Sequence, residues 1–341
     1  MSEDNKNPVE QIDPSEVAGI KDTYDKVTAE LRKKIIGQNE VVEQLLISIF
    51  SNGHCLMVGV PGLAKTLLVQ SLAETMKLSF KRIQFTPDLM PSDITGTDII
   101  QEDPETRERR FEFLQGPIFA NIILADEINR TPPKTQAALL ESMQERQVTI
   151  GQTTRTLPSP FFVLATQNPI EQEGTYPLPE AQQDRFLFLV WVDYPEGEDE
   201  MNIIKTVTSE SMGEIEPILS GEEIISIQNL LVKIPVPDHV IRYAWKVVRS
   251  LRPGKEEALP LANDWIQWGP GPRASINLVK AAKTRAVLNG NLHVSVDDIQ
   301  AIAHPVLRHR VIPNFGAQAE GYSADRIVDM VLEQIPKDKE V

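Results

Sequence analysis

Lys65 and Thr66 end the stretch GVPGLAKT (59–66), in which an amine and a hydroxyl follow a glycine-bearing loop. Such a loop binds phosphate when its glycines let successive backbone N–H groups face one anion. Lys65 would then reach the β- and γ-phosphates, and Thr66 would coordinate Mg²⁺. The generic pattern has glycine where this chain has Ala64. We expect a negative φ at Ala64, because small size alone would meet the requirement at the start of a helix. A plain turn is the alternative.

Two adjacent carboxylates, Asp126 and Glu127, end the apolar run NIILADE (121–127). The carboxyl ends of the strands are where α/β sheets bind their ligands. Asp126 would hold Mg²⁺ through its water shell, because this ion keeps several waters and takes few protein ligands. Glu127 would polarise the attacking water as a general base. A solvated acidic turn is the alternative.

Three further polar residues would complete such a site: Asn168 in FFVLATQNP, Arg185 in EAQQDRF and Arg273 in GPGPRAS. Asn168 would orient the water or contact the γ-phosphate, and a turn before a proline is its alternative. Arg185 directly precedes an apolar run, and a structural ion pair is its alternative. Arg273 begins a helical pattern and would reach back to the phosphates. A surface arginine at a helix start is the alternative there.

Short apolar runs would position these residues. They are continuous rather than alternating, as expected of strands buried on both faces of a parallel sheet. Helical patterns lie between them, for example KTLLVQSLAETM (65–76) and PPKTQAALLESMQE (132–145). The pattern predicts a doubly wound α/β domain with a parallel five-stranded sheet. The five runs span residues 54–59, 80–85, 121–126, 161–166 and 186–192.

The rest of the chain divides into inserts and a second domain. Residues 86–120 and 147–157 interrupt the strand–helix rhythm, and Gly151-Gln152 in the second predicts a hairpin. We expect a disordered acidic tail over 1–15, the α/β domain over 16–193, a hinge near 193–197 and an all-helical domain over 197–341. The helical patterns of that last domain lie near 197–209, 221–232, 237–252, 274–289, 295–308 and 323–335.

Composition limits the classes of function. The 341 residues carry a net charge of −15 and one cysteine, Cys55, which we expect in the core. No apolar run approaches the roughly 18 residues of a membrane span, and no secretory leader is recognised, so we expect a cytoplasmic protein. The acidic balance argues against a nucleic-acid surface over the whole molecule. Arg107, Arg109 and Arg110 would make only a local basic patch, for which a solvated charged loop is the alternative. The five histidines show no metal-ligand spacing.

The stretches quoted above, together with RIQFTPDLMPSDITG and FEFLQGPIFANIILADEINRTPPKTQAALLESMQERQVTIG, resemble the MoxR family of AAA+ ATPases over about residues 20–320. In that family the loop commonly carries alanine before the lysine. The resemblance implies an AAA+ core with a helical lid. It also implies that the inserts correspond to the helix-2 insert and to the hairpin before sensor 1.

The resemblance implies a role for each site residue. Asp126 and Glu127 match Walker B, Asn168 matches sensor 1 and Arg273 matches sensor 2. Arg185 resembles the arginine finger that one subunit supplies to its neighbour's nucleotide. Gly37 and Gln38 match the segment that lies against the adenine. The Walker A residues, which would bind ATP, are Gly59, Pro61, Gly62, Leu63, Ala64, Lys65, Thr66 and Leu67.

The function implied by this resemblance is Mg²⁺-dependent ATP hydrolysis in a homo-oligomeric ring, with a hexamer the expected size. The ring would remodel client proteins in a chaperone-like way, and proteins with von Willebrand factor A domains are candidate partners. Three alternatives stay open: a magnesium-chelatase-like metal-insertion motor, a nucleic-acid motor and a P-loop kinase. No residue pattern identifies the client.

Overall fold

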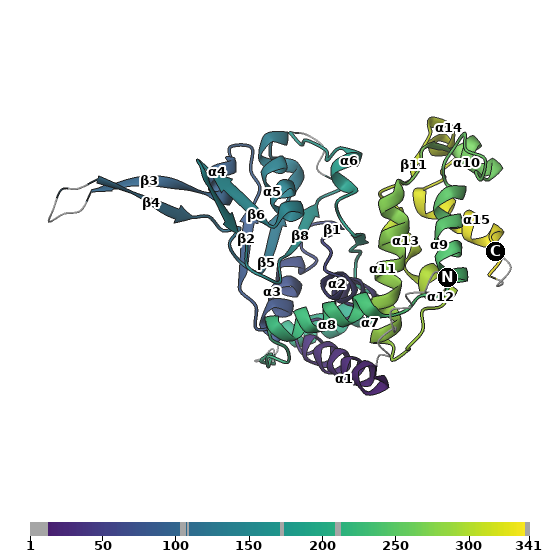
Figure 1. Ribbon diagram of the computed structural model, residues 1–341, viewed down its shortest axis with the longest axis horizontal. Helices are drawn as coiled ribbons and strands as arrows, with labels where there is room; N and C mark the ends of the chain where they lie inside the picture. The colour runs from purple at the N-terminus through teal and green to yellow at the C-terminus, as the bar shows by residue number, and fades with distance from the viewer. Residues whose placement is uncertain (1–12, 103–106, 108, 171–173, 209–212, 338–341) are drawn as a thin grey trace, which may run out of the picture.

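The computed structural model describes residues 13–102, 107, 109–170, 174–208 and 213–337 (Figure 1). Of the tail predicted over 1–15, residues 1–12 lie outside the described residues, and the first helix begins at Pro14. No described helix is both long and apolar enough to cross a membrane. The elements up to the last strand of the main sheet are α1 (Pro14–Leu31), α2 (Asn39–Phe50), β1 (Cys55–Val58), α3 (Lys65–Thr75), β2 (Phe80–Gln84), α4 (Pro91–Thr95), β3 (Gly96–Glu102), β4 (Arg109–Gln115), β5 (Ile122–Asp126), the 3₁₀ helix η1 (Ile128–Arg130), α5 (Pro133–Glu145), β6 (Gln147–Ile150), β7 (Thr153–Thr156), β8 (Phe162–Gln167), α6 (Glu180–Gln183) and β9 (Phe188–Trp191).

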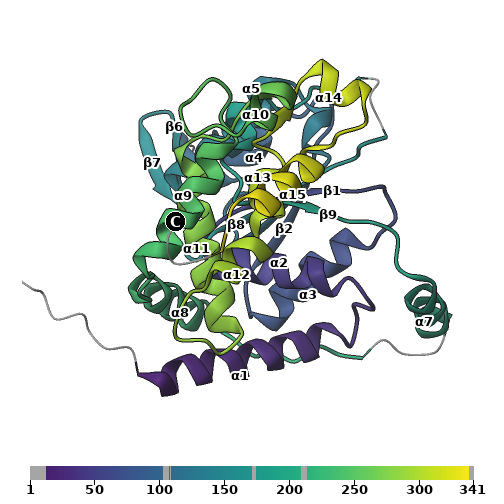
Figure 2. The same ribbon diagram turned by 90° about the vertical axis from the view of Figure 1, so that its right-hand side faces the viewer.

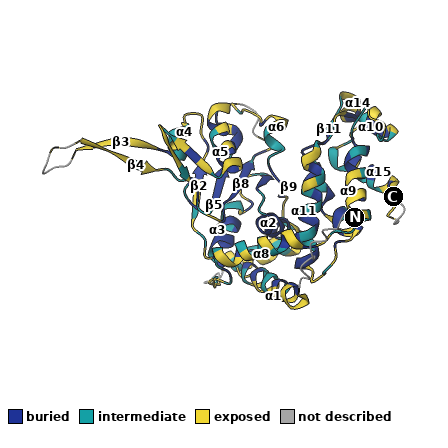
Figure 3. Cartoon of the chain, viewed as in Figure 1, coloured by how far each residue is buried: buried dark blue, intermediate teal, exposed yellow. Residues whose placement is uncertain are grey.

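The five apolar runs form the predicted parallel sheet, and among the described residues its strand order is β2-β5-β8-β1-β9. In β1, Cys55 and Met57 face one hydrophobic cluster while Leu56 and Val58 face the other. Both faces of the sheet are therefore buried, which explains why these strands carry continuous apolar runs. Figure 3 shows the same contrast between the buried strands of the sheet and the exposed outer hairpin.

Both predicted inserts contain antiparallel hairpins. Within 86–120, β3 and β4 pair with each other and extend away from the body as a long arm (Figure 1). Within 147–157, β6 and β7 pair around Gly151, whose φ of 59° suits a tight hairpin turn. Of the three arginines of the possible basic patch, Arg109 pairs with Glu102 at 3.1 Å, so its charge is compensated on the arm itself.

The second half of the chain is mainly helical, and it differs from the prediction in two ways. A short antiparallel pair, β10 with β11, lies among its helices, and strands this short give no apolar-run signal. In addition, α8 packs on the α/β domain, where Gln228 Nε2 donates to the Ile49 carbonyl at 2.8 Å. The elements are α7 (Gly197–Thr208), α8 (Gly221–Lys233), α9 (Asp238–Ser250), α10 (Pro260–Trp265), β10 (Ile266–Trp268), α11 (Pro272–Leu288), α12 (Val296–Ala301), α13 (Ala303–Leu307), β11 (Ile312–Pro313), α14 (Phe315–Ala319) and α15 (Ala324–Gln334).

The turn from β1 into α3 corrects one expectation. Ala64 precedes α3 with a φ of 52°, so the prediction of a negative φ is wrong. The chain reverses within a few residues there, and Gly62, with a φ of 86°, and Ala64 both supply left-handed backbone. A left-handed residue followed by the helical Lys65 turns successive N–H groups toward one side, which is the geometry of an anion-binding nest. The strain at Ala64 is thus compatible with phosphate binding.

Ala64→Gly should raise the free energy of unfolding by up to about 1 kcal/mol, because glycine adopts this backbone without the Cβ clash. The matched control is Ala73→Gly in the interior of the same helix, which should lower it by about 1 kcal/mol. Urea unfolding of both variants measures the difference. Equal destabilisation by the two substitutions would contradict the left-handed backbone at Ala64.

His54 is a buried histidine at the start of β1. Its Nε2 donates to the Met143 carbonyl at 3.1 Å, and its Nδ1 accepts from the Val163 N–H at 3.0 Å. This pattern requires the neutral ring. Burial lowers the pKa of His54 from 6.5 to about 4. Between these values the unfolded chain binds a proton that the folded chain does not, so stability falls as the pH falls.

The loss of stability between about pH 6.5 and pH 4 should reach about 3 kcal/mol for this one group. His54→Gln should flatten that part of the pH profile, even if the variant is less stable at neutral pH. The exposed His293→Gln serves as the control and should leave the profile unchanged. Urea unfolding measured at several pH values checks both, and an unchanged slope for His54→Gln would assign the acid sensitivity to other groups.

Candidate functional site

A hollow of about 380 Å³ lies at the carboxyl edge of the sheet and collects most of the predicted site. The order of the strands explains the position, because β1 lies between β8 and β9 and β5 lies on the other side of β8. The loop after β1 and the ends of β5 and β8 therefore meet at one edge. The residues that line the hollow are Pro61, Gly62, Leu63, Ala64, Lys65, Thr66, Arg82, Asp126, Glu127, Thr166, Gln167 and Asn168.

Lys65 lies back across the start of its own loop. Its ammonium group donates to the Gly59 carbonyl at 2.5 Å and to the Val60 carbonyl at 2.8 Å. Burial lowers the pKa of Lys65, while the nearby Asp126 and Glu127 carboxylates raise it. To bind a phosphate, the ammonium group would exchange these carbonyls for phosphate oxygens, with which it forms charge-assisted hydrogen bonds.

The two carboxylates have different partners. Asp126 accepts at Oδ1 from the Thr166 hydroxyl at 2.6 Å and at Oδ2 from Arg82 Nε at 3.0 Å. Glu127 has a left-handed φ of 56° and accepts at Oε2 from Gln84 at 2.7 Å and from Arg130 at 2.9 Å. A strained residue fixed by several hydrogen bonds is typical of functional sites. Asp126 is thus held rigidly at the strand end, and Glu127 is turned out of the strand direction.

Sequence reasoning missed Thr166 and Arg82. Thr166 is buried in β8, and it also accepts from the Glu127 N–H at 2.9 Å, so one hydroxyl fixes both carboxylates. It stands at the end of an apolar run, and that position is the signal that could have identified it. Arg82 belongs to the edge strand β2, where its register opposite Leu124 brings it beside Asp126. Only the pairing of the strands reveals that contact.

Asn168 lies in the hollow as predicted, and it also adopts the alternative role of a turn residue. Its Oδ1 accepts from the Ile170 N–H at 3.1 Å. The amide nitrogen is therefore the group of this side chain that can still donate to a ligand oxygen.

The residues of this hollow fit Mg²⁺. The Thr66 hydroxyl and the Asp126 carboxylate line it together, and Mg²⁺ takes one or two such oxygen ligands with waters and substrate phosphates. Asp126 Oδ1, which accepts only from Thr166 among the described residues, keeps a second lone pair for a ligand, whereas Oδ2 accepts from both Nε and Nη2 of Arg82. Among the described residues no group of three or more His, Cys, Asp or Glu could hold a metal ion by itself.

Four residues assigned to nucleotide binding do not line this hollow: Gly37, Gln38, Gly59 and Leu67. A Cβ at Gly59 would collide with the Val192 carbonyl, so this glycine is required by the close approach of the chain after β9. Gly37 and Gln38 both have positive φ and precede α2. A Cβ at Gly37 would collide with the Asp199 carboxylate of α7, which places the start of α7 over this segment.

Arg185 and Arg273 lie together in a different hollow, of about 330 Å³, with His54, Met143, Gln144, Asp184, Ile276 and Asn277. Arg273 forms an ion pair with Asp184 at 3.5 Å. Arg185 is half-buried, and no side-chain partner for its guanidinium is found among the described residues. The structure therefore does not bring either arginine to the loop hollow of the same chain.

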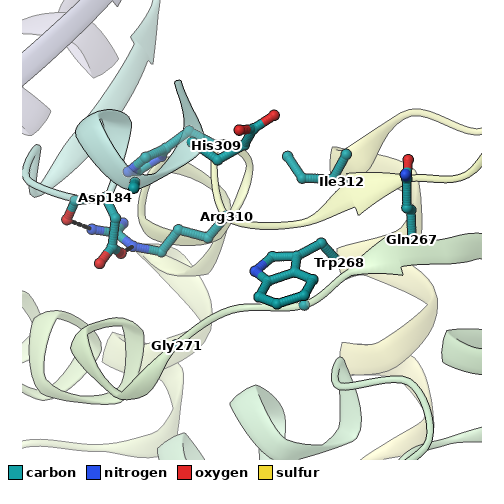
Figure 4. Close-up of a pocket in the computed structure, with 10 residues that line it drawn as sticks. Asp184, Gln267, Trp268, Gly271, His309, Arg310 and Ile312 are labelled. Carbon is teal, nitrogen blue, oxygen red and sulfur yellow. Dashed lines mark hydrogen bonds and ion pairs between the residues drawn. The ribbon is translucent and has the colours of Figure 1, made fainter. Parts of the chain in front are cut away.

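The turn that carries Arg185 is held by the helical domain. Arg310 is almost completely buried, and it donates to the Asp184 carboxylate at 2.7 Å and to the Phe186 carbonyl at 2.7 Å. His309 Nε2 lies 3.3 Å from the same carbonyl. Figure 4 shows Arg310 beside Asp184 in the wall of an adjoining pocket of about 490 Å³. Sequence reasoning missed this contact, because residues 126 positions apart form it.

The chain matches two family models and several known proteins. Residues 54–188 match the ATPase family associated with various cellular activities (AAA), and residues 260–331 match the AAA lid domain. Chaperone MoxR1 of Mycobacterium tuberculosis is 40% identical over 96% of this chain and 87% of that protein. YeaC of Bacillus subtilis is 40% identical over 91% of this chain and 93% of that protein.

A solved structure agrees with these sequence matches. The crystal structure of a protein assigned as an ATPase, from Cytophaga hutchinsonii, superposes with a TM-score of 0.88 at 42% identity. The match covers 95% of this chain and 97% of that chain. Because these relatives match along nearly the whole length and the two family models match in order, the chain belongs to the MoxR family of AAA+ ATPases.

Proposed function

We propose that this ATPase works as a homo-oligomeric ring, with a hexamer the expected size, that remodels client proteins in a chaperone-like way. ATP and Mg²⁺ would bind at the loop hollow, through the backbone of 59–66, Lys65, Thr66 and Asp126. The same proposal divides the chain near 193–197 into a core and a lid and places the protein in the cytoplasm. The name of the Mycobacterium tuberculosis relative supports the chaperone-like part.

The observation that carries the ring is the separation of Arg185 from the loop hollow. Arg185 and Arg273 share one hollow, whereas Lys65, Asp126 and Glu127 share another. A single chain thus has the phosphate-binding half of a site in one place and the candidate arginines in another. Contact between two copies would join the two halves at every interface.

In phosphoryl transfer to water, the protein contributes mainly positioning and neutralisation of charge. Glu127 would orient and deprotonate the attacking water, and the amide of Asn168 would hold that water or a γ-phosphate oxygen. Lys65 of one copy and Arg185 of its neighbour would offset negative charge from two sides. Arg273 would move with the lid, so opening and closing of the nucleotide site would be coupled to the helical domain.

Mixing two inactive variants tests this arrangement. Arg185→Ala should lower ATPase activity by about 10³-fold or more, because it removes the arginine from every interface. Glu127→Gln should bind ATP without hydrolysing it. A mixture of the two should regain activity, because the intact loop of an Arg185→Ala copy can meet the Arg185 of a Glu127→Gln copy. ATPase activity per subunit, measured against total concentration, is the readout.

The control for this mixing experiment is Arg326→Ala, which changes an exposed arginine outside both hollows and should keep full activity. A mixture that stays inactive, although sedimentation shows that both variants assemble together, would contradict the shared site. So would wild-type activity per subunit that does not change with concentration.

The β3–β4 arm is the surface we propose for the client. Ile100 and Phe111 stand opposite each other across the arm, and their side chains are 63% and 77% exposed. These two apolar side chains are exposed on an arm away from the core, so they do not contribute to core packing. Exposed apolar patches of this kind are typical of interaction sites. Proteins with von Willebrand factor A domains are the candidate partners, on the family resemblance alone.

A pulldown from native lysate with Glu127→Gln protein held in ATP should capture the client, identified by mass spectrometry. The double substitution Ile100→Ser and Phe111→Ser in that background should lose the captured protein and leave ATP binding unchanged. In otherwise unmodified protein, the same pair should leave basal ATPase activity unchanged. Capture that is equally strong with and without the arm substitutions would exclude the arm as the client surface.

A further inference from the structure

Helix α7 is an amphipathic helix that lies on the surface of the described part of the chain. None of its residues is buried, and Met201, Ile204 and Val207 are each more than half exposed. Spaced three apart, they form one apolar face. A 12-residue helix is marginal in water and depends on packing of its apolar face. A surface that covers this face would therefore stabilise the helix.

A groove of the same chain has the matching properties. It has a volume of about 610 Å³ and is formed by α2, α8, α9 and α11. Val232, Ile241, Trp245 and Ile276 line it and are all exposed. Lys280 and Lys283 lie in its wall, where they donate to the carbonyls of Asn52 and Val232. Neither lysine has a carboxylate at ion-pair distance among the described residues.

Charge distinguishes the two surfaces. The first turn of α7 carries Glu198, Asp199 and Glu200, and Glu200 lies one helical turn before Ile204 on the apolar face. In the groove, burial lowers the pKa of both lysines, and for Lys280 the positive charge of Arg146 lowers it further. A carboxylate brought to these lysines would thus be bound more strongly than at an exposed site.

The positions of the two surfaces exclude contact within one chain. Figure 2 shows α7 at one edge of the molecule, while α8, α9 and α11 lie toward the opposite edge. The start of α7 covers Gly37, on the side assigned to the nucleotide. Ile276 lines both the groove and the hollow that holds Arg185 and Arg273. A neighbouring copy that brings Arg185 and Arg273 to the loop hollow would therefore also bring its groove to the side of this chain that carries α7.

We propose that α7 of one copy docks in the α2–α8–α9–α11 groove of the next copy, with its apolar face against Trp245 and Val232 and Glu200 at Lys280 and Lys283. The contact joins two different surfaces, so it repeats from copy to copy head to tail, as the proposed ring requires. This inference rests on the proposed assembly and names the surface that forms it.

Cysteine cross-linking tests the contact, because Cys55 is buried and leaves a clean background. Ile204→Cys protein mixed with Val232→Cys protein, both also carrying Glu127→Gln and held in ATP, should form a disulfide-linked dimer of the two variants. The double variant Ile204→Cys and Val232→Cys should form a ladder of covalent oligomers. Asn202→Cys, on the opposite face of α7, replaces Ile204→Cys in the matched control and should give only background.

A second measurement uses charge and does not depend on oxidation. In sedimentation velocity, Ile204→Asp should abolish assembly, while Asn202→Asp should retain it. Both variants should bind a fluorescent ATP analogue as the wild-type protein does. Glu200→Lys should weaken assembly, and Glu200→Lys combined with Lys283→Glu should restore it.

Several results would overturn the docking while leaving the proposed function intact. The first is an assembled ring in which cysteines at Ile204 and Val232 cross-link no better than the control pair. The second is a disulfide-linked dimer formed by Ile204→Cys protein alone. The third is a disulfide within one chain of the double variant. A wild-type protein that stays monomeric with ATP would overturn the ring itself, and sedimentation distinguishes that case from the others.

Discussion

The buried guanidinium of Arg310 is the contact that ties the turn carrying Arg185 to the helical domain. Its side chain is 2% exposed, and it binds the Asp184 carboxylate together with the carbonyls of Asp184, Phe186 and Leu187. A planar group with five donors can satisfy such a set of acceptors in one geometry only. The turn that carries Arg185 is therefore fixed by the helical domain. Any displacement of that domain would be transmitted to Arg185.

A second constraint acts at the strand ends. Thr166 binds both the Asp126 carboxylate and the Glu127 N–H, so two neighbouring strands fix the carboxylates together. Glu127 and Ala64 have left-handed backbones, which the surrounding contacts must hold in place. In the proposed site, the nucleotide half would thus be held by the sheet, whereas the arginine half would be attached to the helical domain. This division suits a machine that couples hydrolysis to domain movement.

The sequence predicts the strands and the loop well, because each depends on local signals. Continuous apolar runs identify all five sheet strands, and the Gly151 turn identifies the second hairpin. What it misses depends on contacts between distant segments. Arg310 with Asp184, Arg82 with Asp126, and α8 on the α/β domain all require the folded topology. The prediction of a negative φ at Ala64 is wrong for a different reason. The residue type indicates the φ angle only weakly, and the sharp turn into α3 imposes a positive φ.

Charge decides how copies of such a chain can meet. At a net charge of −15, two copies repel each other over much of their surface. Attraction must therefore come from local regions of the opposite sign. Lys280 and Lys283 line the groove, with the positive charge of Arg146 acting on Lys280, and Arg185 and Arg273 lie in the hollow next to it. In the proposed assembly, the acidic start of α7 and the carboxylates Asp126 and Glu127 would lie on the other partner surface. Two cationic flanks, or two acidic ones, would repel each other, so the distribution favours a head-to-tail ring over a symmetric dimer.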